Sequence, residues 1–157
     1  MSIPFDTKVL VDDDFESMRR IVGQLLHDMG FRDIALADDG ATALAMLRQD
    51  DFGLLVTDWH MPQMDGIELV RAVRADPRLN PIPILMVSAE ATREQIIAAV
   101  KAGVNDYVVK PFKPKVLVAR IRARIRRVVD APAQVIFVGD LEIDVTGHTV
   151  KRGGEVL

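Results

Sequence analysis

Five short apolar runs recur along the first part of the chain, and each is followed by an amphipathic stretch. The runs are only three to five residues long, which is too short for typical globular helices and suits buried strands. The expected strands are Lys8–Val11, Ile34–Ala37, Leu54–Val56, Ile84–Val87 and Asp106–Val109. Strands that alternate with helices every 20–25 residues or so require right-handed crossovers. The alternation therefore predicts an α/β fold, with a parallel sheet covered by helices on both faces.

The stretches between these runs show helical spacing. In the first of them, Ile21, Leu25 and Met29 recur at steps of four, and Gly30 supplies a stop signal. The expected helices are Phe15–Met29, Ala41–Gln49, Ile67–Arg74, Thr92–Ala102 and Pro114–Val128. The last is strongly basic, but neighbouring acids and the lack of interleaved aromatic residues favour a solvated or partner-docking face over a nucleic-acid surface.

Composition excludes several classes of function. The chain has 157 residues, 49% of them hydrophobic and 27% charged, with a net charge of −3. This favours one globular domain, with a fragment of a second, and argues against a polyanion binder. The absence of cysteine excludes disulfides, thiolate metal sites and cysteine nucleophiles. We find neither a signal peptide nor an apolar run long enough to span a membrane, so we expect a cytoplasmic protein.

The C-terminal part has a different sequence pattern from the rest, with short alternating segments separated by glycines. We predict a first domain over residues 1–128, a linker over 129–134 and an antiparallel β meander over 135–157, with turns at Gly139, Gly147 and Gly153-Gly154. About 23 residues are too few to bury a core of their own. The meander must therefore pack on the first domain, or the chain was cut before a second domain was complete.

Polar residues follow several of the expected strands, where open α/β sheets place their chemistry. Asp12 to Asp14, Asp58, Ser88 and Lys110 all fall at carboxyl ends, on one edge of the sheet. Grouped carboxylates repel each other unless a cation neutralises them, and oxygen ligands without His or Cys favour Mg²⁺. A lysine and a hydroxyl nearby suit a phosphate. The combination predicts that Asp58 is a carboxylate nucleophile that accepts a phosphoryl group.

Each of these residues also has a simpler interpretation. The acidic run suits a helix N-terminus, Ser88 could cap the following helix, and Lys110-Pro111 could merely end a strand. Taken singly, these interpretations are favoured. Their coincidence on one edge of one sheet favours a site.

The segments KVLVDDDFESMRR, TDWHMPQMDG, PILMVSAEA and DYVVKPF resemble the receiver domain of two-component response regulators, over about residues 5–128. The similarity is greatest to the chemotaxis branch of that family. The resemblance implies a flavodoxin-like, doubly wound sheet of strand order 2-1-3-4-5. It also implies a phosphoacceptor switch, whose only catalysis is its own phosphotransfer and dephosphorylation.

The resemblance also implies roles for individual residues. Asp58 would take its phosphoryl group from the phosphohistidine of a histidine kinase or phosphotransfer protein. Mg²⁺ would be bound by Asp13, Asp14, Asp58 and the backbone carbonyl of His60. Ser88 would be the switch hydroxyl, Tyr107 the switch aromatic and Lys110 the family's lysine, in a cis peptide with Pro111.

Two positions depart from the family pattern. Asp12 stands where an apolar strand residue is usual, so either the strand ends early or the pocket gains an extra acid. His60 replaces a small polar residue and, at the mouth of the pocket, could alter the lifetime of the phosphoryl group. A solvated loop histidine is the simpler interpretation. Trp59 is expected to be a half-exposed neighbour of the site.

The tail FVGDLEIDVTGHTVKRGGEVL resembles the opening sheet of the winged-helix effector in the OmpR/PhoB class of transcriptional regulators. The resemblance implies control of transcription. The DNA-reading helix of that class would follow later, so DNA binding is expected only through a complete effector domain. The class dimerises through the face spanning Thr92–Arg127, where Asp106 and Arg120 fit one charged pair. Ile96 and Val116 replace another pair with apolar residues.

Two other functions compete with this hypothesis. A stand-alone receiver would act by docking on another protein, and the sequence beyond Leu157 would discriminate it. A Mg²⁺-dependent phosphohydrolase with an aspartyl nucleophile usually carries a second acid two residues later, where this chain has His60. No Gly-rich phosphate loop is present either.

Overall fold

A computed structural model describes residues 5–125, 135–138, 141–144, 149–152 and 155–156. Strands and helices alternate over the first 125 residues. They are β1 (Val9–Asp12), α1 (Glu16–Met29), β2 (Ile34–Ala37), α2 (Gly40–Gln49), β3 (Leu54–Thr57), α3 (Gly66–Ala75), β4 (Ile84–Ser88), α4 (Arg93–Ala102), β5 (Asp106–Val109) and α5 (Pro114–Ile125). The predicted alternation is confirmed, and the ends of the elements differ from the prediction by one or two residues at most of the boundaries described.

The first five strands form one parallel sheet of order β2-β1-β3-β4-β5, as expected. Leu10, Leu55 and Leu85 in its three central strands are fully buried. Sheets of this kind are covered on both faces, so their strands are apolar throughout rather than alternating.

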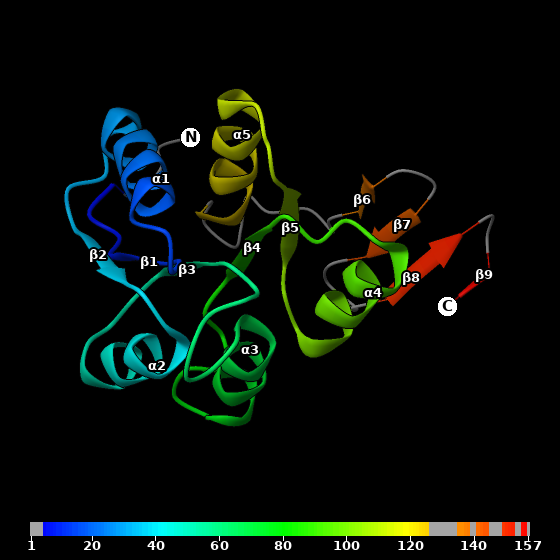
Figure 1. The fold of residues 1–157 in the computed structure, drawn as a ribbon, viewed down its shortest axis with the longest axis horizontal. Coiled ribbons are helices and arrows are strands. Elements are labelled where there is room, and N and C mark those ends of the chain that lie inside the picture. The colour runs from blue at the N-terminus through cyan, green and yellow to red at the C-terminus, as the bar shows by residue number, and fades with distance from the viewer. Residues whose placement is uncertain (1–4, 126–134, 139–140, 145–148, 153–154, 157) are drawn as a thin grey trace.

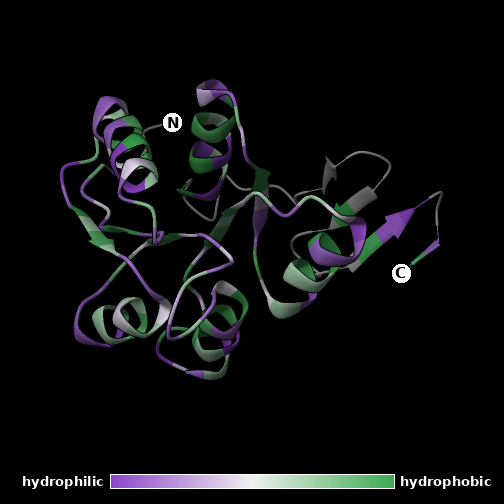
Figure 2. Ribbon diagram, viewed as in Figure 1, coloured by the Kyte–Doolittle hydropathy of each residue, from purple (hydrophilic) through white to green (hydrophobic). Residues whose placement is uncertain are grey.

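Helices cover the sheet in two layers (Figure 1). Helices α1 and α5 lie over one face, and α2, α3 and α4 lie over the other. Each layer has its own core, because successive strand residues point to opposite faces. Val9 and Val11 belong to the core under α1 and α5, and Leu10 belongs to the other. The helices are apolar toward the sheet and polar outward (Figure 2).

A four-stranded antiparallel sheet follows, of order β6-β7-β8-β9, which confirms the predicted meander. Its strands are β6 (Val135–Val138), β7 (Leu141–Asp144), β8 (Thr149–Arg152) and β9 (Glu155–Val156). Ile143 and Val150 are fully buried and belong to the same core as α4. The segment therefore packs on the first domain, which is the first of the two expectations for it.

Other predictions lie partly or wholly outside the described residues. They include the predicted linker over 129–134, the end of the last helix at 126–128 and the proposed glycine turns. Among the described helices, none combines the length and apolar character needed to cross a bilayer.

Candidate functional site

Asp58 lies directly after β3, at the carboxyl edge of the sheet. Its backbone N–H donates to the Asp12 carbonyl at 2.9 Å, which continues the strand pairing one residue further. Its Oδ1 accepts from the N–H of Trp59 at 2.7 Å, so the carboxylate is held in one orientation. Burial raises the pKa of Asp58, and the charge of Lys110 opposes that shift. The residue is 7% exposed, which leaves it open only on the pocket side.

Three carboxylates meet at this edge. Asp13, Asp14 and Asp58 each place an oxygen within 4.8 Å of the other two. The turn that carries the first two is fixed from several sides. Oδ1 of Asp13 accepts from Phe15 N–H at 2.9 Å, and its carbonyl accepts from the Arg19 guanidinium at 2.6 Å. A set of hard oxygen donors with no thiolate or imidazole fits a magnesium ion.

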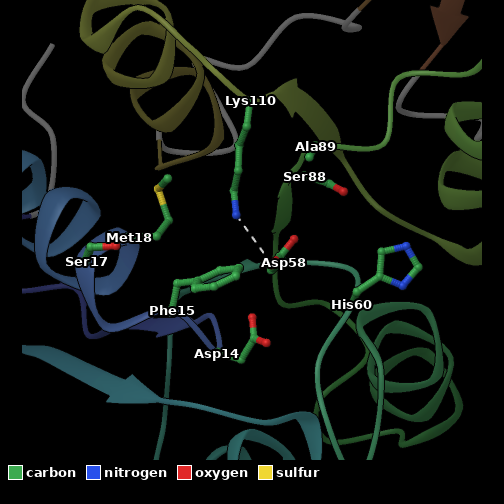
Figure 3. Close-up of a pocket in the computed structure, with 9 residues that line it drawn as sticks. All are labelled: Asp14, Phe15, Ser17, Met18, Asp58, His60, Ser88, Ala89 and Lys110. Carbon is green, nitrogen blue, oxygen red and sulfur yellow. Dashed lines mark ion pairs between the residues drawn. The ribbon is translucent and has the colours of Figure 1, made fainter.

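Lys110 enters the same space from the end of β5 (Figure 3). Its Nζ lies 2.9 Å from Oδ2 of Asp13 and 3.3 Å from Oδ2 of Asp58. Its backbone N–H donates to the Ser88 carbonyl at 2.8 Å, and the Lys110-Pro111 peptide is cis, as the resemblance implied. The lysine thus places one positive charge between two carboxylates that come from different strands.

Ser88 and Tyr107 lie next to the carboxylates, on β4 and β5. The Ser88 Oγ accepts from Glu90 N–H at 3.1 Å. The Tyr107 hydroxyl donates to the Glu90 carbonyl at 2.6 Å, and its ring is 3% exposed. Burial raises the pKa of Tyr107 to about 12, so this hydroxyl is protonated at neutral pH. The ring therefore lies inward in this structure.

His60 lies in the loop from β3 to α3. Its exposed side chain places Nε2 2.8 Å from Oε1 of Glu90. His60 is thus an exposed loop histidine, as in the simpler interpretation, and it has an acidic partner in Glu90. Gly66 shapes this loop, because its N–H donates to the Trp59 carbonyl at 2.6 Å and a Cβ there would collide with the Asp58 backbone oxygen.

A family model described as the response regulator receiver domain matches residues 9–122, which is most of the chain. This chain belongs to the response regulator receiver family. Receiver domains act as phosphoacceptor switches rather than as ordinary enzymes, and they interact with histidine kinases or phosphotransfer proteins.

Relatives of two kinds resemble this receiver. "Chemotaxis protein CheY" of Pseudomonas aeruginosa is 59% identical over 121 residues, which cover 77% of this chain and 98% of that protein. "DNA-binding response regulator MtrA" of Mycolicibacterium smegmatis is 42% identical over 148 residues, which cover 94% of this chain and 63% of that protein. The crystallised chemotaxis protein CheY4 of Vibrio cholerae is similar in structure, with a TM-score of 0.70, 35% identity, and 76% and 98% of the two chains covered.

The position of Asp12 fits neither of the two alternatives that the sequence offered for it. Strand β1 does not end before it, and Asp12 is absent from the group formed by Asp13, Asp14 and Asp58. It pairs in register with Thr57 on β3 and shares the parity of Leu10, so its side chain turns to the α2 and α3 side of the sheet. It is fully buried, and neither carboxylate oxygen has a hydrogen-bond partner. Burial is the largest cause that raises the pKa of Asp12 to about 8.

The sequence reasoning missed several residues of the receiver site. Phe15, Ser17, Met18 and Ala89 also line the pocket of about 410 Å³ beside Asp58, and Glu90 contacts both His60 and Tyr107. Phe15 is 64% exposed although it is aromatic. An aromatic residue directly after the acidic run, where a helix N-cap would normally be polar, was the available signal.

The predicted dimer face contains Asp106, Arg120, Ile96 and Val116, and the structure places each of them within one chain. Asp106 is 1% exposed, and its Oδ2 lies 3.5 Å from Arg120 of the same chain. The two residues are therefore already paired within the single chain. Ile96 on α4 is buried, whereas Val116 on α5 is 40% exposed.

Proposed function

We propose that this chain is a phosphorylation-operated switch of a two-component system, with Asp58 as its phosphoacceptor. The observation that carries the proposal is the meeting of Asp58, the Asp13–Asp14 pair and Lys110 at one edge of the sheet. The phosphoryl donor is the phosphohistidine of a histidine kinase or phosphotransfer protein. The site would be reached in the cytoplasm, where such kinases present their phosphohistidine.

In the transfer, a carboxylate oxygen of Asp58 attacks the phosphorus, an O–P bond forms, and the N–P bond of the donor breaks. The Trp59 N–H holds the carboxylate in position during the attack. Lys110 neutralises charge that spreads over the phosphoryl oxygens in the transition state. Phe15 lies against the pocket and excludes part of the solvent from it.

A magnesium ion fits this proposal. The residues that would hold it are Asp13, Asp14, Asp58 and the backbone carbonyl of His60. When bound, the ion would offset carboxylate repulsion and stabilise negative charge on the phosphoryl oxygens. It would also favour the ionised form of Asp58, against the effect of burial.

The phosphoryl group then acts on the switch residues. It brings almost two negative charges and new acceptor oxygens to a position beside Ser88. The Ser88 hydroxyl donates to one of these oxygens, and Lys110 pairs with another. The inward position of Tyr107, held by Glu90, is then favoured over an outward one, as a shift between two populated states.

For the output, we favour control of transcription through a DNA-binding region. The alignment with the DNA-binding regulator MtrA supports this, because it extends over 94% of the chain and so includes the C-terminal sheet. Docking on another protein is the second candidate. The 59% identity to a chemotaxis protein favours it. A helix-turn-helix pattern encoded beyond Leu157 would support the first candidate, and its absence the second.

The phosphoacceptor assignment can be tested by the intact mass of the protein. Wild type incubated with phosphoramidate and Mg²⁺ should gain the mass of one phosphoryl group, and Asp58→Asn should gain none. Asp51→Asn is the matched control, because that carboxylate is almost wholly exposed at the opposite edge of the sheet, and it should label like wild type. Stoichiometric labelling of Asp58→Asn would refute the assignment.

A further inference from the structure

Strand β2 is the terminal strand of the parallel sheet, and its outer edge is open. Among the described residues it pairs with β1 alone. Figure 1 shows it at the outer border of the sheet, and Figure 2 shows that it is apolar along its length. Its sequence, IALA, contains no charged residue and no proline, which commonly protect a sheet edge from pairing. This edge can therefore accept another extended strand.

The main chain of β2 is oriented for such a pairing. The carbonyls of Asp33 and Ala37 accept hydrogen bonds from the side of β1, at 3.0 and 3.1 Å. Main-chain groups alternate in direction along a strand. The N–H and C=O groups of Ile34 and Leu36 therefore point outward, away from β1, and a second strand could bind them.

Leu36 also presents an apolar side chain at this edge. It pairs in register with Val11, so it lies on the face of the sheet that α1 covers. Helix α1 has Gly23 beside it, where a Cβ would meet the Leu36 side chain at 3.9 Å. Because glycine has no side chain to cover it, Leu36 remains 49% exposed. An exposed leucine on an open edge is suited to contact with a second strand.

Charged residues flank the strand in a self-complementary order. Arg32 precedes it, Asp38 follows it, and both are exposed. Neither forms an ion pair in the described part of the chain. An antiparallel pair of β2 strands with Ala35 opposite its own copy brings Arg32 opposite Asp38 in both halves. The same register brings Ile34 opposite Leu36. Residues opposite each other share a face, so their side chains can interact.

The same register also satisfies the main chain. Ile34 and Leu36 have outward N–H and C=O groups, and as opposite residues they can exchange both hydrogen bonds of an antiparallel pair. Ala35 then lies on the twofold axis at a closely spaced position, with Cα atoms about 4.5 Å apart, where a methyl group fits. A shift by two residues in either direction would place Arg32 opposite Leu36 or Ile34 opposite Asp38. Only the first register therefore pairs charge with charge and apolar with apolar.

We propose that β2 is a homodimerisation edge, at which two copies of this chain join their β2 strands antiparallel and extend the sheet across both molecules. The proposal does not depend on the phosphoacceptor assignment. The interface lies at the border of the sheet opposite to β5, so it is distinct from the face spanning Thr92–Arg127. The strand has four residues, so the dimer is weak and forms at high protein concentration.

The register is tested by disulfide formation, because the chain has no cysteine of its own. In Ala35→Cys the two thiols of a dimer lie within reach of each other, and mild oxidation should give a covalent dimer. Asp33→Cys is the matched control, since it is exposed, lies on the same face and has Ala37 as its counterpart across the axis. Its two copies would be about 13 Å apart, so it should stay monomeric. Equal cross-linking of the two variants, or none in Ala35→Cys, would overturn the proposal.

The charge pairing is tested by sedimentation equilibrium of the full chain up to about 1 mM. Arg32→Asp or Asp38→Arg places like charges opposite each other in both halves, and should weaken the dimer by about 10-fold or more. The double variant should restore it. Val116→Asp is the control, since Val116 is 40% exposed on α5, and it should dimerise like wild type.

Three outcomes of the sedimentation experiment would overturn the proposal. A wild type that stays monomeric would leave the β2 edge to an extended segment of another protein or to no partner. Failure of the double variant to restore the dimer would contradict the pairing of Arg32 with Asp38. Loss of the dimer in Val116→Asp would assign the contact to the α5 face instead.

Discussion

Asp12 lowers the stability of the folded state, although it takes no part in the site beside it. Its neighbours Asp13 and Asp14 turn toward the pocket, whereas Asp12 continues the strand and points into the opposite layer. An unpaired buried carboxylate is disfavoured in its ionised form. The raised pKa, about 8, keeps it largely protonated at neutral pH.

Replacement of Asp12 should therefore stabilise the protein, by an amount that increases with pH. The folded state holds this proton up to about pH 8, whereas the unfolded state releases it near 3.8, so stability is full below 3.8 and falls as pH rises toward 8. Asp12→Val removes that loss and should raise the free energy of unfolding at pH 8 by about 1–3 kcal/mol. Urea unfolding at pH 5 and pH 8, in EDTA, measures the difference. An equal effect of the substitution at both pH values would contradict the predicted titration.

At the scale of elements, the loop from β3 to α3 begins with Asp58 of the candidate site and ends at the start of helix α3. Asp65 and Glu68 close a capping box at the start of α3. Gly66 lies against the backbone of Asp58, where no side chain fits. The glycine is thus required by a close approach of two backbone segments, and the loop that presents the His60 carbonyl depends on it.

Substituting alanine for two different glycines should have opposite effects. Gly66→Ala should lower the free energy of unfolding by about 1–3 kcal/mol or more, because the new methyl group has no space. Gly23→Ala, inside α1, should raise it by about 0.5–1 kcal/mol, since its Cβ would meet only Leu36 at 3.9 Å. Urea denaturation of the two variants gives both values. A neutral effect of Gly66→Ala would mean that the loop can move away from Asp58 without cost.

At the scale of the whole molecule, the carboxylate cluster works against folding when no cation is present. Asp13, Asp14 and Asp58 come from two loops, and each has an oxygen within 4.8 Å of the other two. Lys110 forms ion pairs with two of them, Asp13 and Asp58. A ligand that binds only the folded state stabilises it by mass action. Metal binding should therefore raise the free energy of unfolding of the whole domain, in addition to its effect on phosphorylation.

Magnesium should raise the thermal unfolding midpoint of the wild type. At about 100 times its dissociation constant, the ion adds about 2.7 kcal/mol, which corresponds to roughly 5–10 °C for a chain of this length. Asp14→Asn should show a smaller shift, because one ligand loses its charge. Sodium chloride at equal ionic strength serves as the control, and EDTA should reverse the effect. Fluorescence of Trp59, whose N–H binds Asp58, gives a second reading, and a flat response in both would contradict an intact metal site.

The sequence by itself determined the alternation of strands and helices, the parallel sheet and the edge where the polar residues gather. These properties depend on local periodicity and on the position of a residue relative to the end of its own strand, both of which can be read along the chain. For this reason the run Asp12 to Asp14, Asp58, Ser88 and Lys110 could be placed at one edge from the sequence, whereas the choice of Asp13 and Asp14 within that run came from the resemblance to receiver domains.

Only the tertiary structure decided which way the remaining side chains turn and what covers them. Asp12 lies in the layer opposite to its neighbours, Asp106 pairs within its own chain, and Ile143 and Val150 of the C-terminal sheet join the core that contains Ile96. Each of these outcomes depends on contacts between residues far apart in the sequence. Such contacts follow from strand register and layer packing, and neither is written in the local spacing of residues.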